Sequence, residues 1–201
     1  MSSIVIAGNT SGAITIAAPA EAGLNTLTLP ASTGTVALTS DIPAPVTTVQ
    51  THLNTTSSQS ITASTRANIS GLNATITPST TSKRIKVTVR WNGEYSSTIN
   101  YDTVFGIKRD TTDVGNPAAA GSRSVGIAII SQGYWAADAD STPDSVMYSY
   151  IDSPATTSAI TYHATFMQKT TGTLYNQRTV GDGNSTAFER LTSTIILEEI
   201  D

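Results

Sequence analysis

Cysteine and histidine side chains, on which nucleophilic and acid–base catalysis often depends, are scarce in this sequence. It contains no cysteine, and its histidines are His52 and His163. A histidine-based nucleophilic triad would have to draw on one of these two side chains. His52 lies in a predicted linker, His163 occupies the polar phase of a strand-like alternation, and no G-x-S-x-G pattern is present. The sequence therefore predicts a protein that is not an enzyme.

Carboxylates give one loose constellation. Asp138, Asp140 and Asp144 have a spacing that resembles a calcium-binding loop, but Pro143 stands where such a loop needs glycine, and no glutamate follows at the required position. We favour a solvated loop, with ion binding as the alternative, and we expect no metal and no cofactor. Glycoside cleavage by a carboxylate pair is a further alternative, although none of the 15 acidic residues stands out as a pair.

Two neighbouring aromatic residues, Tyr134 and Trp135, lie in an apparent loop after Gly133. Exposed aromatic rings could stack on a sugar ring. They could equally close one end of the fold or contact a sister chain, because aromatic residues are enriched at protein interfaces. We favour closure of the fold's end or a subunit contact, and we keep glycan binding as the alternative.

The composition indicates strands that position these groups. Serine and threonine supply 59 of the 201 residues, and charged residues make up only 13%. Threonine suits strands better than helices because its side chain is branched at Cβ. The net charge of −4 provides no basic patch for nucleic acid or anionic membranes, and no apolar run is long enough to span a bilayer. The first residues carry no positive charge and do not resemble a signal peptide.

Large side chains divide the chain into two parts, because every aromatic residue lies between Trp91 and Phe188. The first forty residues hold four short apolar runs, beginning at 3, 13, 25 and 35, with glycines between them. So short a segment seldom stabilises itself without association. We predict that residues 1–41 form a docking segment of short strands, which binds sister chains or a larger body. A flexible tail is the alternative.

Residues 42–60 are the predicted linker, because Pro43 and Pro45 oppose a helix. A short coiled coil over this segment is the alternative. Residues 61–201 form the predicted C-terminal domain, in which segments such as 85–91 and 160–166 alternate apolar and polar side chains. Turns without crossover helices favour an all-β antiparallel β-sandwich of the jelly-roll type, with an immunoglobulin-like sandwich as the alternative. Strands are predicted at about 60–63, 68–77, 84–91, 101–109, 123–131, 146–152, 159–168, 173–180 and 190–200.

Residues 12–41, GAITIAAPAEAGLNTLTLPASTGTVALTSD, resemble a segment near the N-termini of structural proteins of tailed bacteriophages, notably fibre-like proteins of cyanophages and marine phages. The core of the likeness is TLTLPASTGTVALTSD. GLNATITPSTTSKRIKVTVRW, FGIKRD, TYHATF and STIILEEI resemble the same group, so the likeness covers most of the chain.

The resemblance implies a virion protein, assembled in the host cytoplasm, that forms a homotrimer. Its jelly-roll head would be similar to the heads of complement C1q and tumour necrosis factor. The function implied is a capsid decoration or cement protein, and the alternative is a short tail fibre that recognises host-surface glycans. Expected partners are other copies of the chain and the phage capsid or tail proteins. The residues expected to dock on the virion are Leu27, Leu29, Pro30, Thr33, Gly34, Val36, Leu38 and Asp41.

Overall fold

The computed structural model describes residues 3–7, 13–17, 47–95, 102–119, 121–130 and 140–201. The chain divides into two compact units, Met1–Ala44 and Pro45–Asp201. Each unit is described by itself.

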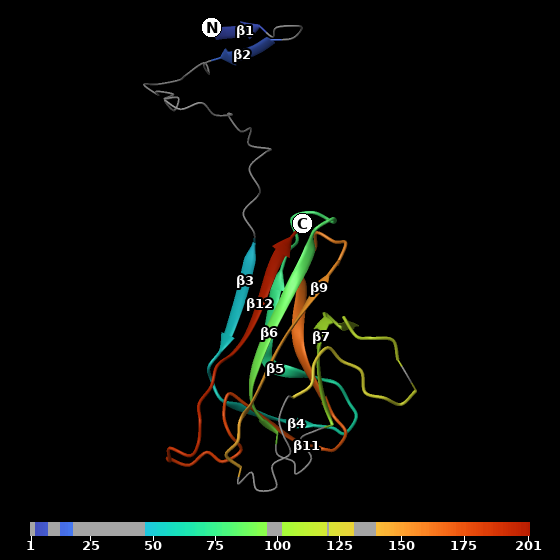
Figure 1. Cartoon of the computed structure of the whole chain (residues 1–201), viewed down its shortest axis with the longest axis vertical. Helices are drawn as coiled ribbons and strands as arrows, with labels where there is room; N and C mark the ends of the chain where they lie inside the picture. Colours follow the sequence, from blue (N-terminus) through green and yellow to red (C-terminus); the bar gives the residue numbers. More distant parts are fainter. Residues whose placement is uncertain (1–2, 8–12, 18–46, 96–101, 120, 131–139) are drawn as a thin grey trace. The chain divides into compact units, whose positions relative to one another are not determined.

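The N-terminal unit contains an antiparallel hairpin of β1 (Ser3–Ala7) and β2 (Ala13–Ala17), both in blue in Figure 1. Its register pairs Ile4 with Ile16 and Ile6 with Ile14. The first two strands predicted in this segment are thereby confirmed, in agreement with the strand preference of β-branched residues. The runs that begin at 25 and 35 lie outside the described residues.

All regular secondary structure in the described part of the second unit is β-strand, which confirms the all-β class (Figure 1). The strands are β3 (Thr48–Leu53), β4 (Ser57–Ile61), β5 (Ala67–Ile76), β6 (Arg84–Tyr95), β7 (Thr103–Arg109), β8 (Thr112–Val114), β9 (Asp144–Asp152), β10 (Ile160–Gln168), β11 (Gly172–Asn176) and β12 (Ser193–Ile200).

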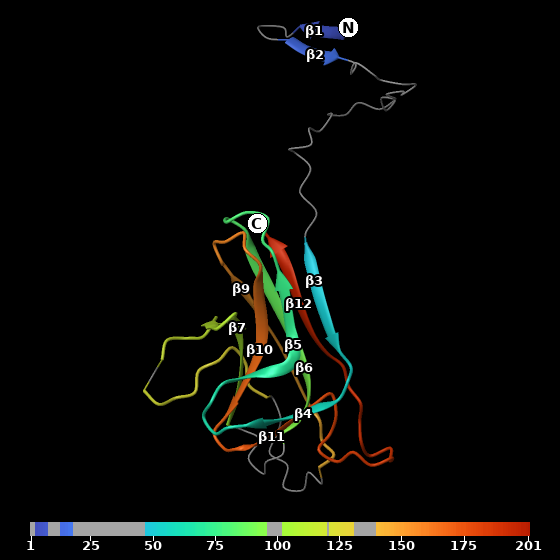
Figure 2. The ribbon, with the colours of Figure 1, turned by 180° about the vertical axis from the view of Figure 1, so that it is seen from behind.

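Two antiparallel sheets pack face to face, as the two opposite views show (Figures 1 and 2). One has the order β5-β10-β7-β8, and the other has the order β3-β12-β6-β9, with β11 and β4 added beside the last residues of β6. We set β4 and β11 aside and number the other strands of this unit from 1 (β3) to 8 (β12) in chain order. The strand order is then 1-8-3-6 in the sheet β3-β12-β6-β9 and 2-7-4-5 in the sheet β5-β10-β7-β8. This order is that of a jelly roll, so the predicted sandwich is confirmed.

The core lies between the sheets and explains why the aromatic residues are confined to this unit. Trp91, Phe105 and Phe166 are fully buried, and the ring of Phe105 lies 5.1 Å from each of the other two. Trp91 also donates a hydrogen bond from Nε1 to Oδ1 of Asn176 at 2.8 Å, so its polar group is satisfied inside the core. The predicted core phases of residues 85–91 and 160–166 are buried.

A buried polar contact joins the sheets as well. Asp152 on β9 accepts hydrogen bonds from Tyr162 Oη on β10 at 2.7 Å and from Arg109 Nη1 on β7 at 2.8 Å. Burial raises the pKa of Tyr162 above its ordinary value, and the hydrogen bond to Asp152 adds to this effect. The Tyr162 hydroxyl therefore stays protonated and donates a hydrogen bond to the carboxylate of Asp152.

The predicted linker is wrong over residues 48–60. The second unit begins at Pro45, and β3 pairs with β12 from Thr48 to Leu53. Val49, Thr51 and Leu53 are half-buried and alternate with exposed residues, which excludes the coiled-coil alternative. The sequence of β3 is rich in threonine and resembles a linker. It forms a strand because β12 supplies its hydrogen-bond partners.

The strand predicted at 123–131 is also wrong. Between Gly121 and Ile130 the described chain makes a single bridge, from Ala128 to Phe105, and is otherwise irregular. A side chain at Gly126 would place its Cβ 2.6 Å from the carbonyl oxygen of Phe105. The segment therefore crosses close over β7 without joining its ladder.

Candidate functional site

The residues expected to bind partners fall mostly outside the described residues. These are Tyr134, Trp135, Asp138 and the docking set Leu27, Leu29, Pro30, Thr33, Gly34, Val36, Leu38 and Asp41. Two other aspartates of the calcium-loop-like group are described. Asp140 is exposed in a turn, whereas Asp144 is buried at the start of β9. The described residues contain no group of three or more His, Asp or Glu side chains able to hold a metal ion.

The two histidines lie on different sheets. His52 on β3 approaches Thr194, with 3.0 Å between its Nδ1 and the threonine Oγ1. His163 on β10 is half-buried, and its partners in register are Asn73 on β5 and Lys108 on β7. Partial burial lowers the pKa of His163 below its ordinary value. The fold does not bring the histidines together, and each is placed as a strand residue beside polar neighbours.

The outer faces of the two sheets differ in chemistry. On the sheet β5-β10-β7-β8, Thr75 and Thr161 share a hydrogen bond of 2.8 Å, and His163 and Lys108 lie in neighbouring positions. On the other sheet, Met147 and Ile151 of β9 are 70% and 45% exposed. The first outer face is therefore polar around Thr161 and His163 and carries the half-buried pair Met167 and Val104 further along β10 and β7. The other outer face exposes the large apolar side chains of Met147 and Ile151.

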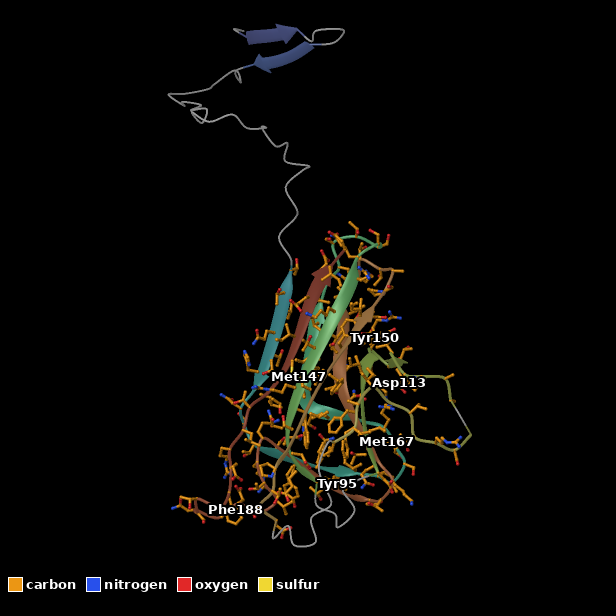
Figure 3. The ribbon with its side chains drawn as sticks, viewed as in Figure 1. Tyr95, Asp113, Met147, Tyr150, Met167 and Phe188 are labelled. Carbon is orange, nitrogen blue, oxygen red and sulfur yellow. The ribbon has the colours of Figure 1, made fainter. Side chains whose placement is uncertain are left out.

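The apolar outer face centres on β9, β6 and β12, and we name it the β9 face. Met147 projects over this side of the sandwich (Figure 3). The register places Ser149 beside Thr88, and Thr88 beside the half-buried Ile196. The face thus consists of Thr88, Met147, Ser149, Ile151 and Ile196.

Two cations lie beside the β9 face, and one of them is paired with a carboxylate. Lys86, next to Ile151 in register, forms an ion pair of 2.8 Å with Glu198. Arg90, next to Met147, donates a longer hydrogen bond of 3.4 Å to the carbonyl of Thr192. The β9 face thus combines the apolar side chains of Met147 and Ile151 with hydroxyl groups and flanking charged side chains on β6. Such a mixture of apolar, hydroxyl and charged groups occurs at protein–protein interfaces.

The sequence of β9 contains a signal for this face, although none of the predicted sites includes it. In β9, the residues Val146 and Tyr148 are core residues, so the intervening positions should be polar. Met147 and Ile151 instead place apolar side chains on the outward phase. A strand that is apolar on both phases is covered on both faces in many folds.

None of the described residues belongs to a helix long and apolar enough to cross a membrane. The sequence matches no protein-family model, and no curated protein is significantly similar to it.

Proposed function

We propose that this protein is a non-enzymatic structural protein of a tailed-phage particle, a trimeric capsid decoration or cement protein anchored by its N-terminal segment. The observation that carries the proposal is the β9 face, where the apolar side chains of Met147 and Ile151 are 70% and 45% exposed on the outer side of the jelly roll. The resemblance of residues 12–41 to phage structural proteins supplies the particle and the threefold symmetry.

Self-association follows from the chemistry of the β9 face. Burying an exposed Met or Ile side chain contributes about 1.5–3 kcal/mol. The ion pair of Lys86 with Glu198 offsets one charge beside this face, and Arg90 keeps its positive charge at the margin. A second copy of the chain presents the same apolar side chains, and three copies would bury Met147 and Ile151 around one axis with Arg90 toward solvent.

Anchoring follows from the size of the N-terminal unit. Its described part is a two-stranded hairpin with five residues in each strand. A two-stranded hairpin is at best marginally stable in water, and three or more strands or a packing partner are needed for independent stability. We expect the capsid surface to act as that partner, with Leu27, Leu29 and Val36 among the contacts.

The second candidate is a short tail fibre that recognises host glycans. It is favoured by a cavity at one end of the jelly roll, whose lining includes Ser64, Arg123 and Lys169. Immunogold labelling of purified particles separates the two candidates: a decoration protein covers the head, whereas a fibre labels only the tail.

The oligomer is tested by native mass spectrometry of the full chain and of Met147→Lys. We expect a trimer for the wild type and monomer for the variant, because three added ammonium groups would be buried beside the three Arg90 guanidiniums. Thr75→Lys is the matched control, since it adds the same charge at an exposed strand position on the opposite outer face. Circular dichroism checks that both variants are folded. A wild-type monomer, or loss of the trimer in both variants, would contradict the proposal.

A further inference from the structure

A cavity of about 490 Å³ opens at the end of the jelly roll where β7 begins and β10 ends. The chain enters the jelly roll, and β12 ends, at the opposite end (Figures 1 and 2). The cavity is lined by hydroxyl, charged and aliphatic side chains, which include Ser64, Asp102, Ser122, Arg123, Ser124, Ile129 and Lys169.

Beside the cavity, residues 125–128 are held on β7. Phe105 donates its backbone N–H to Ala128 at 2.7 Å, and Ile127 donates to the carbonyl of Phe105 at 2.8 Å. Arg66 secures the same segment: its guanidinium donates to Thr165 Oγ1 at 3.0 Å and to the carbonyl of Val125. These contacts fix the position of the chain that leads from the cavity wall to Ile129.

Positive charge exceeds negative charge among the lining residues. Arg123 and Lys169 contribute two cations, and Asp102 contributes one carboxylate. The Lys169 ammonium lies 3.7 Å from Asp102, in an ion pair whose two side chains are both exposed, so the pair contributes little by itself. An anionic group can therefore share the lysine. The guanidinium of Arg123 is suited to bind a carboxylate through two parallel hydrogen bonds.

The other lining groups fit a sugar ring. Three serine hydroxyls, at Ser64, Ser122 and Ser124, can each donate and accept a hydrogen bond, as sugar hydroxyls require. Ile129 is 61% exposed and offers an aliphatic surface for the C–H face of a ring. Ser64 has a φ of 54°, in the left-handed region, and its N–H donates to Gln168 at 2.7 Å. Strained backbone of this kind is common where a side chain is held for binding.

We propose that this cavity binds an acidic saccharide, a sugar that carries a carboxylate. Lys169 and Arg123 bind the carboxylate, the serines bind the ring hydroxyls, and Ile129 packs against the ring. The volume falls within the range of small-ligand sites. This inference goes beyond the cement function, which needs no ligand, and is independent of the trimer.

The test is a titration of the full chain, labelled at isoleucine methyl groups, with sodium glucuronate. We expect the Ile129 methyl signal to shift and saturate while Ile151, on the β9 face, stays unchanged. Glucose, which is similar in size but neutral, should bind at least about tenfold more weakly, because a charge-assisted hydrogen bond contributes about 1.5–3 kcal/mol.

Variants assign the contacts. Lys169→Met should weaken glucuronate binding about tenfold or more, and Asp102→Asn should strengthen it by removing a competing carboxylate. Lys108→Met, which removes a lysine from the polar outer face, is the matched control and should bind as the wild type does. The proposal is overturned by an unshifted Ile129 signal or by equal losses in Lys169→Met and Lys108→Met. Inorganic phosphate as effective as glucuronate would also overturn it, because the cavity would then bind anions without recognising a sugar.

Discussion

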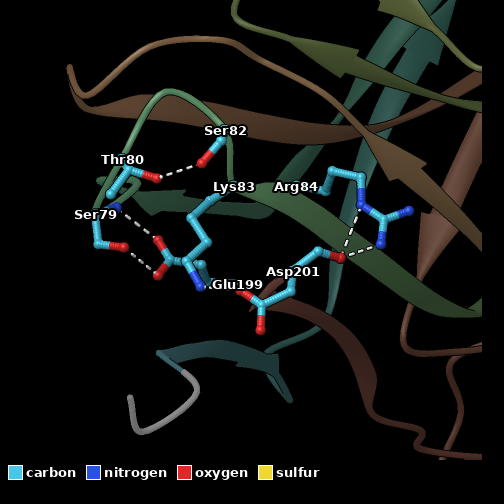
Figure 4. Close-up of polar contacts among 7 residues, drawn as sticks. All are labelled: Ser79, Thr80, Ser82, Lys83, Arg84, Glu199 and Asp201. Carbon is cyan, nitrogen blue, oxygen red and sulfur yellow. Dashed lines mark hydrogen bonds and ion pairs between the residues drawn. The ribbon is translucent and has the colours of Figure 1, made fainter. Parts of the chain in front are cut away.

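At the residue scale, Glu199 ties the end of β12 to the turn between β5 and β6. Its carboxylate accepts hydrogen bonds from the backbone N–H and the hydroxyl of Ser79, both at 2.6 Å (Figure 4). The last residue is held nearby, since Lys83 pairs with the Asp201 side chain and Arg84 donates to its carbonyl oxygen. These contacts close the end of the sandwich at which the chain enters.

The hydrogen bonds from Ser79 lower the pKa of Glu199 below its ordinary value of 4.5. A carboxylate whose pKa is lowered by folding stabilises the native state above the unfolded pKa, and this contribution is lost as the pH falls through the folded pKa. The pKa of Lys83 shifts in the opposite direction, because the hydrogen bond with the side chain of Asp201 raises it above 10.5. The contribution of Lys83 to folding stability is therefore lost only as the pH rises through that raised pKa.

We expect Glu199→Gln to lower the free energy of unfolding by about 1 kcal/mol at neutral pH, because it weakens two hydrogen bonds to a charged group. The difference from the wild type should shrink as the pH falls below 4.5 and through the lowered folded pKa of Glu199, because the wild-type carboxylate becomes protonated over this range. Urea unfolding at several pH values measures both effects. Glu189→Gln, at an exposed loop position, is the control and should show neither. A difference that is constant with pH would refute the assignment.

At the element scale, the irregular segment 121–130 depends on close contact with β7. Gly126 permits this contact, because a Cβ there would lie 2.6 Å from the Phe105 oxygen and 3.0 Å from the Val104 Cβ. Both neighbours belong to a strand paired on its other side with β10, so they cannot move away easily. The segment itself must therefore shift when a larger residue is introduced.

Gly126→Ala should cost about 1–3 kcal/mol of stability, the usual range for overpacking. Hydrogen exchange should accelerate at the amides of Phe105 and Ile127, which bond across the contact. Gly121→Ala is the control. Its φ of 65° strains an alanine, but no atom lies within 4 Å of the new Cβ. It should lose about 1–2 kcal/mol through the backbone alone and leave exchange at those amides unchanged.

At the scale of the whole molecule, two units have different sources of stability. The second unit has an aromatic core between two sheets, whereas the described part of the first unit is a single hairpin. The boundary lies between Ala44 and Pro45, before β3. Because β3 forms a ladder with β12, it stabilises the jelly roll and is not part of the segment that joins the first unit to it.

Deletion of residues 1–44 should leave a folded jelly roll with an almost unchanged Tm, and the proposed anchoring function predicts that this variant does not bind phage particles. Deletion of residues 1–53 removes β3 and exposes the ladder edge of β12, so its Tm should fall markedly. Thermal unfolding and co-sedimentation with particles that lack the protein measure the two properties. Particle binding by the 1–44 deletion would show that the first unit is not the anchor.

The sequence alone determined those features of the protein that depend on local periodicity. Alternation in residues 85–91 and 160–166 identified strands and their core faces, and the absence of crossover helices identified a sandwich. These predictions hold because successive side chains on a strand point to opposite faces of the sheet. An apolar residue at every second position therefore identifies the buried face from the local sequence alone. The outward apolar residues of β9 were visible in the same way.

Only the tertiary structure decided which segments meet. Residues 48–53 become a strand because β12, far along the chain, provides their hydrogen-bond partners, and nothing in their own composition requires it. The cavity combines Ser64, Asp102, Ile129 and Lys169, which no short pattern connects. Such contacts are set by strand order and by the packing of two sheets, which are non-local properties of the chain, and local sequence preferences do not encode them.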